Sequence, residues 1–313
     1  MSSTPPPYTV GPGYERWREA AEKAHYRAPM EPGRPKYWLH ILLFVLTIGT
    51  TMVAYGGRML PNGVFYLDWG QGLEYSFWLL LILGCHEFGH YFAAKRHRVR
   101  ATLPFFIPLP LPPLGTMGAV IRMSPYIPNR RALFDIASAG PLAGIIVAIP
   151  VSLVGMLSAY HAPLPAPGVM DFTLRFSDPL MLRGMEWLIL GPRPEGHDVV
   201  LGPMGFAGWV GMFVTALNLL PLSQLDGGHV SYAVFGRKSR FIAFAIFGAL
   251  ILVMVFSGWQ YLLLLALVWF AGLTHPPTLD DVIEIGPTRR FLALVLLVIF
   301  VLCFTPKPIV SMP

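Results

Sequence analysis

The amino-acid sequence predicts an all-α polytopic membrane protein, and three observations support this fold class. Hydrophobic residues make up 54% of the 313 residues and charged residues only 13%, whereas a typical soluble domain carries about 25% charged residues. Several apolar runs approach or exceed the roughly 20 residues that a helix needs to cross the hydrocarbon layer. The Lys and Arg residues also gather on one side of the implied topology. A soluble enzyme is therefore excluded.

Six or seven transmembrane helices are expected, because Phe241–Leu273 could be either a tight hairpin or one long tilted helix. The last segment is short and needs flanking residues or local thinning of the bilayer to cross. The candidate segments are Tyr37–Tyr55, Tyr75–Ala94, Leu133–Ala159, Met204–Leu222, Phe241–Gly258, Trp259–Leu273 and Phe291–Phe304.

Charge asymmetry predicts the orientation. With seven spans, 18 of the 23 Lys and Arg residues lie on the same side as the amino terminus. The positive-inside rule then places that terminus in the cytoplasm. Basic loops facing anionic lipid account for the net charge of +6 without a nucleic-acid partner.

Met1–Gly33 is polar and Pro-rich, unlike a removable signal peptide. The lack of a targeting sequence and the compact outer loops favour a bacterial or archaeal cell membrane, and a eukaryotic organelle stays open as the alternative.

The chain divides into a polar cytoplasmic segment (1–36), a transmembrane domain (37–304) and a short tail (305–313). The run Leu103–Leu114 is too apolar for a solvated loop and too Pro-rich for a helix. It predicts a small β or re-entrant segment associated with the membrane, shielded by protein or a wet cavity. The outer segment His161–Pro203 is too short for a typical inserted domain. Both cysteines lie in apolar runs, so no disulfide framework is expected.

The string His86-Glu87-Phe88-Gly89-His90 lies inside the second apolar segment. Residues four apart share one face of a helix, so two imidazoles can bind one metal ion while the glutamate between them acts as general base. The alternative is a set of polar residues satisfied by neighbouring helices without metal. Each ionisable residue near the bilayer centre costs about 3 kcal/mol, which argues against three of them without a function.

A catalytic zinc usually takes three protein ligands and leaves one position for water. Asp226 is the best candidate for the third ligand, since it follows the fourth apolar segment on the same side of the membrane. The alternative is an ordinary turn aspartate ahead of Gly227 and Gly228. Spacing alone leaves these two readings even. His229 as a fourth ligand would close the water position, and the remaining histidines have no ligand spacing.

Three motifs in this order resemble the site-2 protease family of intramembrane zinc metalloproteases. The His-Glu-Phe-Gly-His string comes first, Ser138-Ala-Gly-Pro141 lies in the next apolar segment, and Asn218-x-x-Pro221-x-x-x-Leu225-Asp226-Gly227 follows a later one. The resemblance covers about residues 75–230. It implies a catalytic core of three helices, the segments that contain His86, Gly140 and Asn218.

The resemblance also implies roles for particular residues. His86, His90 and Asp226 would bind one Zn²⁺ per chain, and Glu87 would activate water. Gly115-Thr116-Met117-Gly118 is similar to the family's glycine-bearing segment, where a sheet accepts an unwound substrate; an ordinary glycine turn is the alternative. Asn218 could bind substrate backbone or make a polar contact between helices.

The function expected from these motifs is regulated intramembrane proteolysis. Glu87 would act toward the cytoplasmic leaflet on the transmembrane segment of a protein substrate. Two other classes compete: a metal or ion transporter that passes a cation between the same ligands, and a catalytically idle membrane scaffold. The expected partners are the substrate and the lipid bilayer, with no nucleic acid; substrate identity and oligomeric state stay open.

Overall fold

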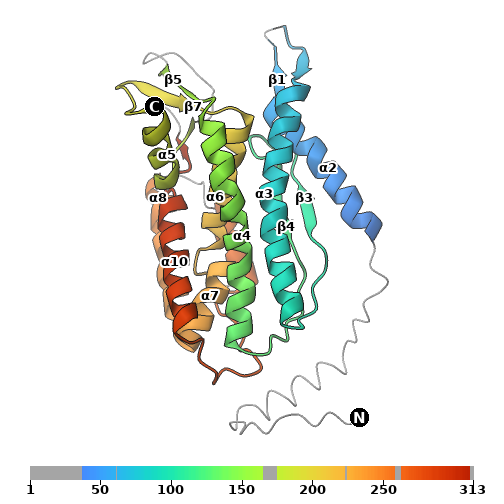
Figure 1. Ribbon diagram of the computed structural model, residues 1–313, viewed down its shortest axis with the longest axis vertical. Helices are drawn as coiled ribbons and strands as arrows, with labels where there is room; N and C mark the ends of the chain where they lie inside the picture. The colour runs from blue at the N-terminus through green and yellow to red at the C-terminus, as the bar shows by residue number, and fades with distance from the viewer. Residues whose placement is uncertain (1–36, 61, 165–174, 223, 258–261, 311–313) are drawn as a thin grey trace. The chain divides into compact units, whose positions relative to one another are not determined.

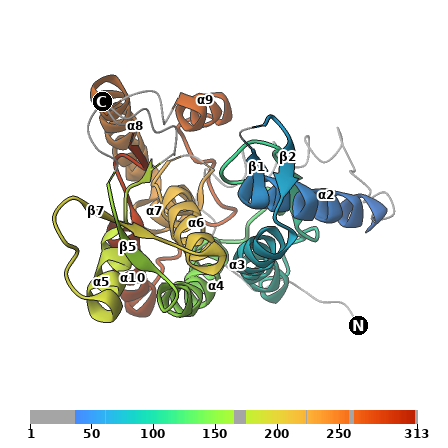
Figure 2. The ribbon, with the colours of Figure 1, turned by 90° about the horizontal axis from the view of Figure 1, so that it is seen from above.

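A computed structural model describes residues 37–60, 62–164, 175–222, 224–257 and 262–310. The polar segment 1–36 expected from the sequence lies outside this description. The chain forms two compact units, Met1–Leu39 and His40–Pro313, and everything that follows concerns the second. Figures 1 and 2 show the helices, coloured in chain order. They are α2 (Tyr37–Gly56), α3 (Trp69–Arg96), α4 (Arg130–Met156), α5 (Leu180–Leu190), α6 (Pro203–Asn218), α7 (Asp226–Phe235), α8 (Ser239–Ser257), α9 (Leu262–Ala271) and α10 (Pro287–Cys303).

Helices α3, α4 and α6 form the centre of this unit, and each packs against the other two (Figures 1 and 2). Small residues make the close approach possible. A Cβ atom on Gly89 would lie 2.5 Å from the Ala139 carbonyl oxygen, and one on Gly155 would lie 2.4 Å from the Gly205 nitrogen. Small residues are the usual means of packing helices inside a membrane, where no hydrophobic effect drives association. These three helices correspond to the core implied by the family resemblance.

Three helical stretches among the described residues are long and apolar enough to cross a membrane. They are Tyr37–Gly56, Arg130–Met156 and Asp226–Phe256, the last formed by α7, a short 3₁₀ turn and most of α8. The expected polytopic helical fold is therefore supported, but six or seven spans are not confirmed. Phe241–Leu273 contains two helices, α8 and α9, separated by residues 258–261, which lie outside the description.

The strands form four two-stranded antiparallel sheets. The Pro-rich run contains extended backbone, as its sequence predicts, in a hairpin that pairs Phe105 with Val120 and Phe106 with Ala119. The later strand of this hairpin, Thr116–Val120, pairs along one edge with the earlier strand. Its other edge has no strand partner among the described residues. The pairs are β1 (Gly57–Met59) with β2 (Phe65–Leu67), β3 (Phe105–Pro108) with β4 (Thr116–Val120), β5 (Tyr160–Pro163) with β7 (His197–Val200), and β6 (Arg175–Phe176) with β8 (Ile309–Val310).

A cluster of charged side chains holds the outer segment together. The Arg193 guanidinium bonds both oxygens of Glu186 at 2.7 and 2.6 Å, contacts Asp178, and donates to Asp198 at 2.9 Å. His161 adds a contact to Glu186 at 3.0 Å. Burial raises the pKa of Asp178. Burial also acts to raise the pKa of Glu186, but the bonds from Arg193 and His161 outweigh it and lower that pKa.

Replacing Arg193 with Met is expected to destabilise the protein by about 3 kcal/mol, because it leaves two buried carboxylates without a cation. The measurement is the thermal unfolding of the purified protein in detergent. Arg290→Met is the matched control, since Arg290 pairs with Glu284 on the exposed surface and such pairs contribute about 0–1 kcal/mol. Equal unfolding curves for the two variants would contradict a structural role for this cluster.

Candidate metal centre

Helix α3 carries the first part of the centre. The helix begins after Asp68, whose side chain accepts a hydrogen bond from the Gln71 amide. His86 and His90, one turn apart, share a face that points into the protein with Glu87 beside it. The three residues are only 4%, 5% and 6% exposed. A buried polar set of this kind requires partners.

The His90 ring has a fixed orientation. Its Nδ1 atom lies 2.8 Å from the Ile136 carbonyl oxygen of α4, so Nδ1 carries the proton and Nε2 keeps its lone pair for a ligand bond. A Cβ atom on Gly140 would lie 2.0 Å from that Nε2, and one on Gly144 would lie 3.2 Å from the His86 ring. The glycines of α4 thus provide the space that the two imidazoles occupy, which explains why the Ser-Ala-Gly-Pro motif has glycine at position 140.

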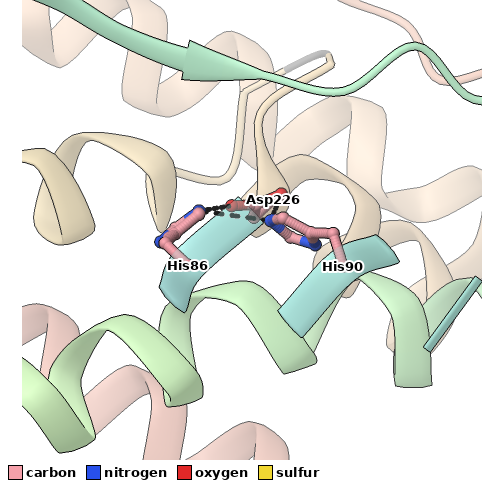
Figure 3. A group of neighbouring side chains, drawn as sticks. All are labelled: His86, His90 and Asp226. Carbon is pink, nitrogen blue, oxygen red and sulfur yellow. Dashed lines mark hydrogen bonds and ion pairs between the residues drawn. The ribbon is translucent and has the colours of Figure 1, made fainter. Parts of the chain in front are cut away.

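Asp226 approaches from the start of α7. A Cβ atom on Gly227 would lie 2.0 Å from the Leu219 carbonyl oxygen, so only glycine permits this close return of the chain after α6. The residue that caps α7 is Leu225, and no side chain caps that helix end. The Asp226 carboxylate instead points toward His86 and His90 (Figure 3). The sequence spacing did not decide whether Asp226 is a metal ligand or a turn residue, and this geometry favours a metal ligand.

The distances between the three donors suit zinc. His86 Nε2 and His90 Nε2 are 3.2 Å apart, and each lies 3.3 Å from an oxygen of Asp226. Donors placed about 2.0 Å from a tetrahedral zinc lie about 3.3 Å from one another. Among the described residues this is the group of His, Cys, Asp and Glu side chains able to hold an ion. Two imidazoles and one carboxylate leave a fourth position for water.

Glu87 completes the predicted set. Its carboxylate lines the same cavity of about 470 Å³ as the three donors and accepts a hydrogen bond from the Ile121 backbone, directly after β4. The cavity is also lined by Ala119 and Val120 at the end of β4. A general base, three metal donors and a strand edge therefore meet in one space. This combination allows hydrolysis of a peptide bond.

The predicted substrate residues are divided between two places. Asn218 lines the cavity, with its amide nitrogen 3.3 Å from His86 Nε2. Gly115, Thr116 and Gly118 do not line it. Gly115 packs on α2, where a Cβ atom would lie 2.5 Å from the Thr51 Cα, and the Thr116 hydroxyl donates to the Ile107 carbonyl within the hairpin.

Two features of the centre escaped sequence reasoning. His275, which has no ligand spacing, lines the cavity and bonds His229 across 46 residues of chain. Asp281 does not line the cavity, but it holds the same segment to α7 by accepting hydrogen bonds from Tyr232 at 2.5 Å and from Thr278 at 2.6 Å. These contacts depend on how the segment between α9 and α10 returns to α7. No local sequence pattern encodes that return.

Replacing Gly140 with Ala is expected to weaken zinc binding by about 10- to 100-fold, because the new methyl group overlaps the His90 ring and misaligns its Nε2. Zinc affinity of the purified protein measures this. Gly248→Ala in α8 is the control, since a Cβ atom there meets nothing within 4 Å. Unchanged zinc affinity in the Gly140 variant would refute the proposed packing of imidazole on glycine.

Comparison with known protein families identifies the family of this chain. The model of peptidase family M50 matches residues 74–259, more than half of the chain and all four residues of the centre. The chain belongs to peptidase family M50. The resemblance to the site-2 protease family is thereby confirmed, and the family implies Zn²⁺, which the donor set fits. No solved structure matches the chain.

Curated relatives carry consistent names. A probable zinc metalloprotease EGY1 of Arabidopsis thaliana, described as chloroplastic, is 29% identical over 308 residues, covering 88% of this chain and 55% of the relative. Chloroplastic EGY2 of the same plant is 31% identical over 170 residues, covering 54% and 30%. EGY1 of Oryza sativa subsp. japonica is 31% identical, covering 75% and 41%. The chain spans about half the length of the curated relatives it matches, or less.

The expected localisation is wrong. These relatives are described as chloroplastic plant proteins, and this finding contradicts the expected bacterial or archaeal cell membrane. Loop lengths and charge asymmetry constrain how helices are arranged across a bilayer. They do not specify which membrane it is, so the sequence had no basis for choosing one.

Proposed function

We propose that this protein is a zinc-dependent endopeptidase that hydrolyses a peptide bond within or near the transmembrane segment of a protein substrate. The observation that carries the proposal is the set of donor distances, 3.2 to 3.3 Å, among His86, His90 and Asp226. Glu87 lies in the same cavity. Family membership supports the same reaction class.

Each residue of the centre has a role in this proposal. His86, His90 and Asp226 would hold the metal, which when bound would act as a Lewis acid and lower the pKa of a water molecule toward about 7. Glu87 takes a proton from the attacking water and transfers it to the departing amine nitrogen. Ile136 fixes the His90 ring through its carbonyl oxygen. Asn218, whose amide lies beside His86, is proposed to contact substrate backbone.

The substrate is proposed to enter as extended backbone. A transmembrane helix must unwind locally before one of its peptide bonds becomes reachable, and unwound backbone needs hydrogen-bond partners. The last residues of β4 line the cavity, and the edge of β4 away from β3 pairs with no other strand in the described part of the chain. This edge can supply those partners by strand addition. Gly115, directly before β4, and Thr116 and Gly118, within it, would then act farther from the cavity, along the bound peptide or through the shape of the hairpin.

The membrane domain is proposed to be residues 37–304, with six or seven spans. Helix α3 has 28 residues, and its polar set lies amid apolar neighbours. Helices α6 and α10, with 16 and 17 residues, approach the length of a span. The catalytic core would be about residues 75–230, with the polar segment 1–36 before the membrane domain and residues 305–313 as a tail. In this tail, β8 pairs with β6.

The test is a cleavage assay on the purified protein in lipid vesicles, with a model substrate that has one transmembrane segment. We expect one zinc per chain, a product cut within or near the apolar segment, loss of activity on chelation, and recovery with zinc. Metal flux across the vesicle membrane without cleavage would instead identify a transporter. Neither flux nor cleavage would identify a scaffold.

A further inference from the structure

Part of the cavity wall comes from outside the family core. The segment between α9 and α10 contributes four consecutive residues, His275 to Thr278, to the cavity that holds the metal donors and Glu87. The family model ends at residue 259. The site therefore combines a shared catalytic set with a wall, His275–Thr278, that the family model does not cover.

His275 anchors this wall to α7. Its Nε2 lies 2.6 Å from His229 Nδ1, and its ring stacks on Tyr232 with centroids 4.5 Å apart. Two nitrogen ligands of one zinc ion lie about 3.3 Å apart. The two ring nitrogens of His229 and His275 are closer than this, at 2.6 Å, so they form a hydrogen bond rather than a pair of metal ligands. His275 Nδ1 bonds the Pro276 carbonyl oxygen at 2.5 Å and therefore carries a proton. With the proton on Nδ1, the Nε2 atom of His275 can accept the bond from His229. Burial lowers the pKa of His275, which disfavours a second proton on this ring.

Backbone contacts hold the other end of the wall. The amide of Leu279 donates to the Ile127 carbonyl, and the amide of Asp280 donates to the Pro128 carbonyl, each at 3.0 Å. Thr278 is buried, and its amide and hydroxyl both donate to Asp281. The wall is thus tied both to α7 and to the segment that leads into α4.

The end of β4 and the wall His275–Thr278 line the same cavity and offer different chemistry to a bound peptide. Beside Glu87, the end of β4 presents a strand edge that can form backbone hydrogen bonds, since no described strand other than β3 pairs with β4. Pro276 and Pro277 are exposed and line the same cavity. Proline has no backbone N–H and a fixed φ, so these residues form a rigid apolar surface that cannot add a strand. A peptide paired on β4 directs alternate side chains to opposite sides.

We propose that His275–Thr278 is a specificity-determining wall, in which Pro276 and Pro277 contact one side chain of an extended substrate close to the scissile bond and favour an apolar residue there. His275 is a positioning residue that fixes the wall through His229. This inference rests on the proposed function and adds the substrate preference of the same site. A charged substrate side chain at this point would lose its water against the two proline rings without gaining a partner.

The first experiment is a cleavage profile over substrates that differ at a single residue flanking the cut. The wild type is expected to prefer Leu over Lys at one position, and Pro277→Asp is expected to shift the Leu-to-Lys ratio of kcat/KM about tenfold toward Lys with unchanged zinc content. Pro306→Asp is the control, since Pro306 is exposed and does not line the cavity. An unchanged ratio in an active, zinc-loaded Pro277→Asp protein would overturn the proposal.

A second experiment reads binding without catalysis. The full chain carries Glu87→Gln and a photo-cross-linking amino acid at position 277, 120 or 306. Each variant is placed in vesicles with the model substrate and irradiated. Cross-links from positions 277 and 120 but not 306 support the wall. Cross-links from 120 alone overturn it. If the wild type cleaves nothing while 277 and 120 still cross-link, hydrolysis is refuted as the function and the binding wall stands.

Discussion

Glu87→Gln is expected to lower the rate of substrate cleavage by about 10²- to 10⁴-fold while leaving zinc content and folding intact. The amide is nearly the same size as the carboxylate, so the packing of α3 is kept. It cannot take a proton from water, and general acid–base catalysis contributes a rate factor of this size. The measurements are initial cleavage rates in vesicles, bound zinc per chain and thermal unfolding.

Glu74→Gln is the matched control. Glu74 lies on the same helix, thirteen residues earlier in the sequence, and is exposed. The same chemical change at this position is expected to leave cleavage at the wild-type rate. Cleavage retained in the Glu87 variant would remove this residue from the reaction, whatever its position in the cavity.

Asp226→Asn is expected to reduce zinc affinity more than about 100-fold, with a parallel loss of cleavage. Removing a residue that only supports a ligand costs about 10- to 100-fold in metal affinity, and removing a charged ligand costs more. The change also leaves two buried imidazoles without their carboxylate partner. Zinc titration with a competing chelator measures the affinity.

Asp280→Asn provides the comparison for this second change. The Asp280 side chain accepts a hydrogen bond from the Val282 amide and does not line the metal cavity. Zinc affinity is expected to stay at the wild-type value. Equal zinc affinity in the Asp226 variant and the wild type would mean that Asp226 is a turn residue, as the Asp-Gly-Gly sequence also permits.

The metal centre was largely predictable from sequence because its signals are local. His86, Glu87 and His90 occupy one helical turn, so spacing alone places them together. The pairing of Asp226 with them is not local, and only the resemblance favoured it over a turn. The fold shows why Asp226 reaches the two histidines: glycine at position 227 allows α7 to begin beside the end of α6.

The fold was predictable where apolar runs are long and unbroken, and less so elsewhere. The expected Leu133–Ala159 segment and the observed α4 differ by only three residues at each end. The outer segment gave no periodic signal, yet it holds α5 and the charged cluster around Arg193. His275 reaches its cavity position through a hydrogen bond to a residue 46 positions away. Contacts of this range depend on tertiary packing.

The central claim is that two imidazoles of α3 and the carboxylate of α7 bind one zinc ion. X-ray absorption at the zinc edge of the purified protein tests it most directly. The account predicts nitrogen and oxygen neighbours at about 2.0–2.2 Å, including two imidazoles, with no sulfur. A sulfur neighbour at about 2.3 Å, which Cys85 beside His86 could supply, or active protein without zinc, would contradict it.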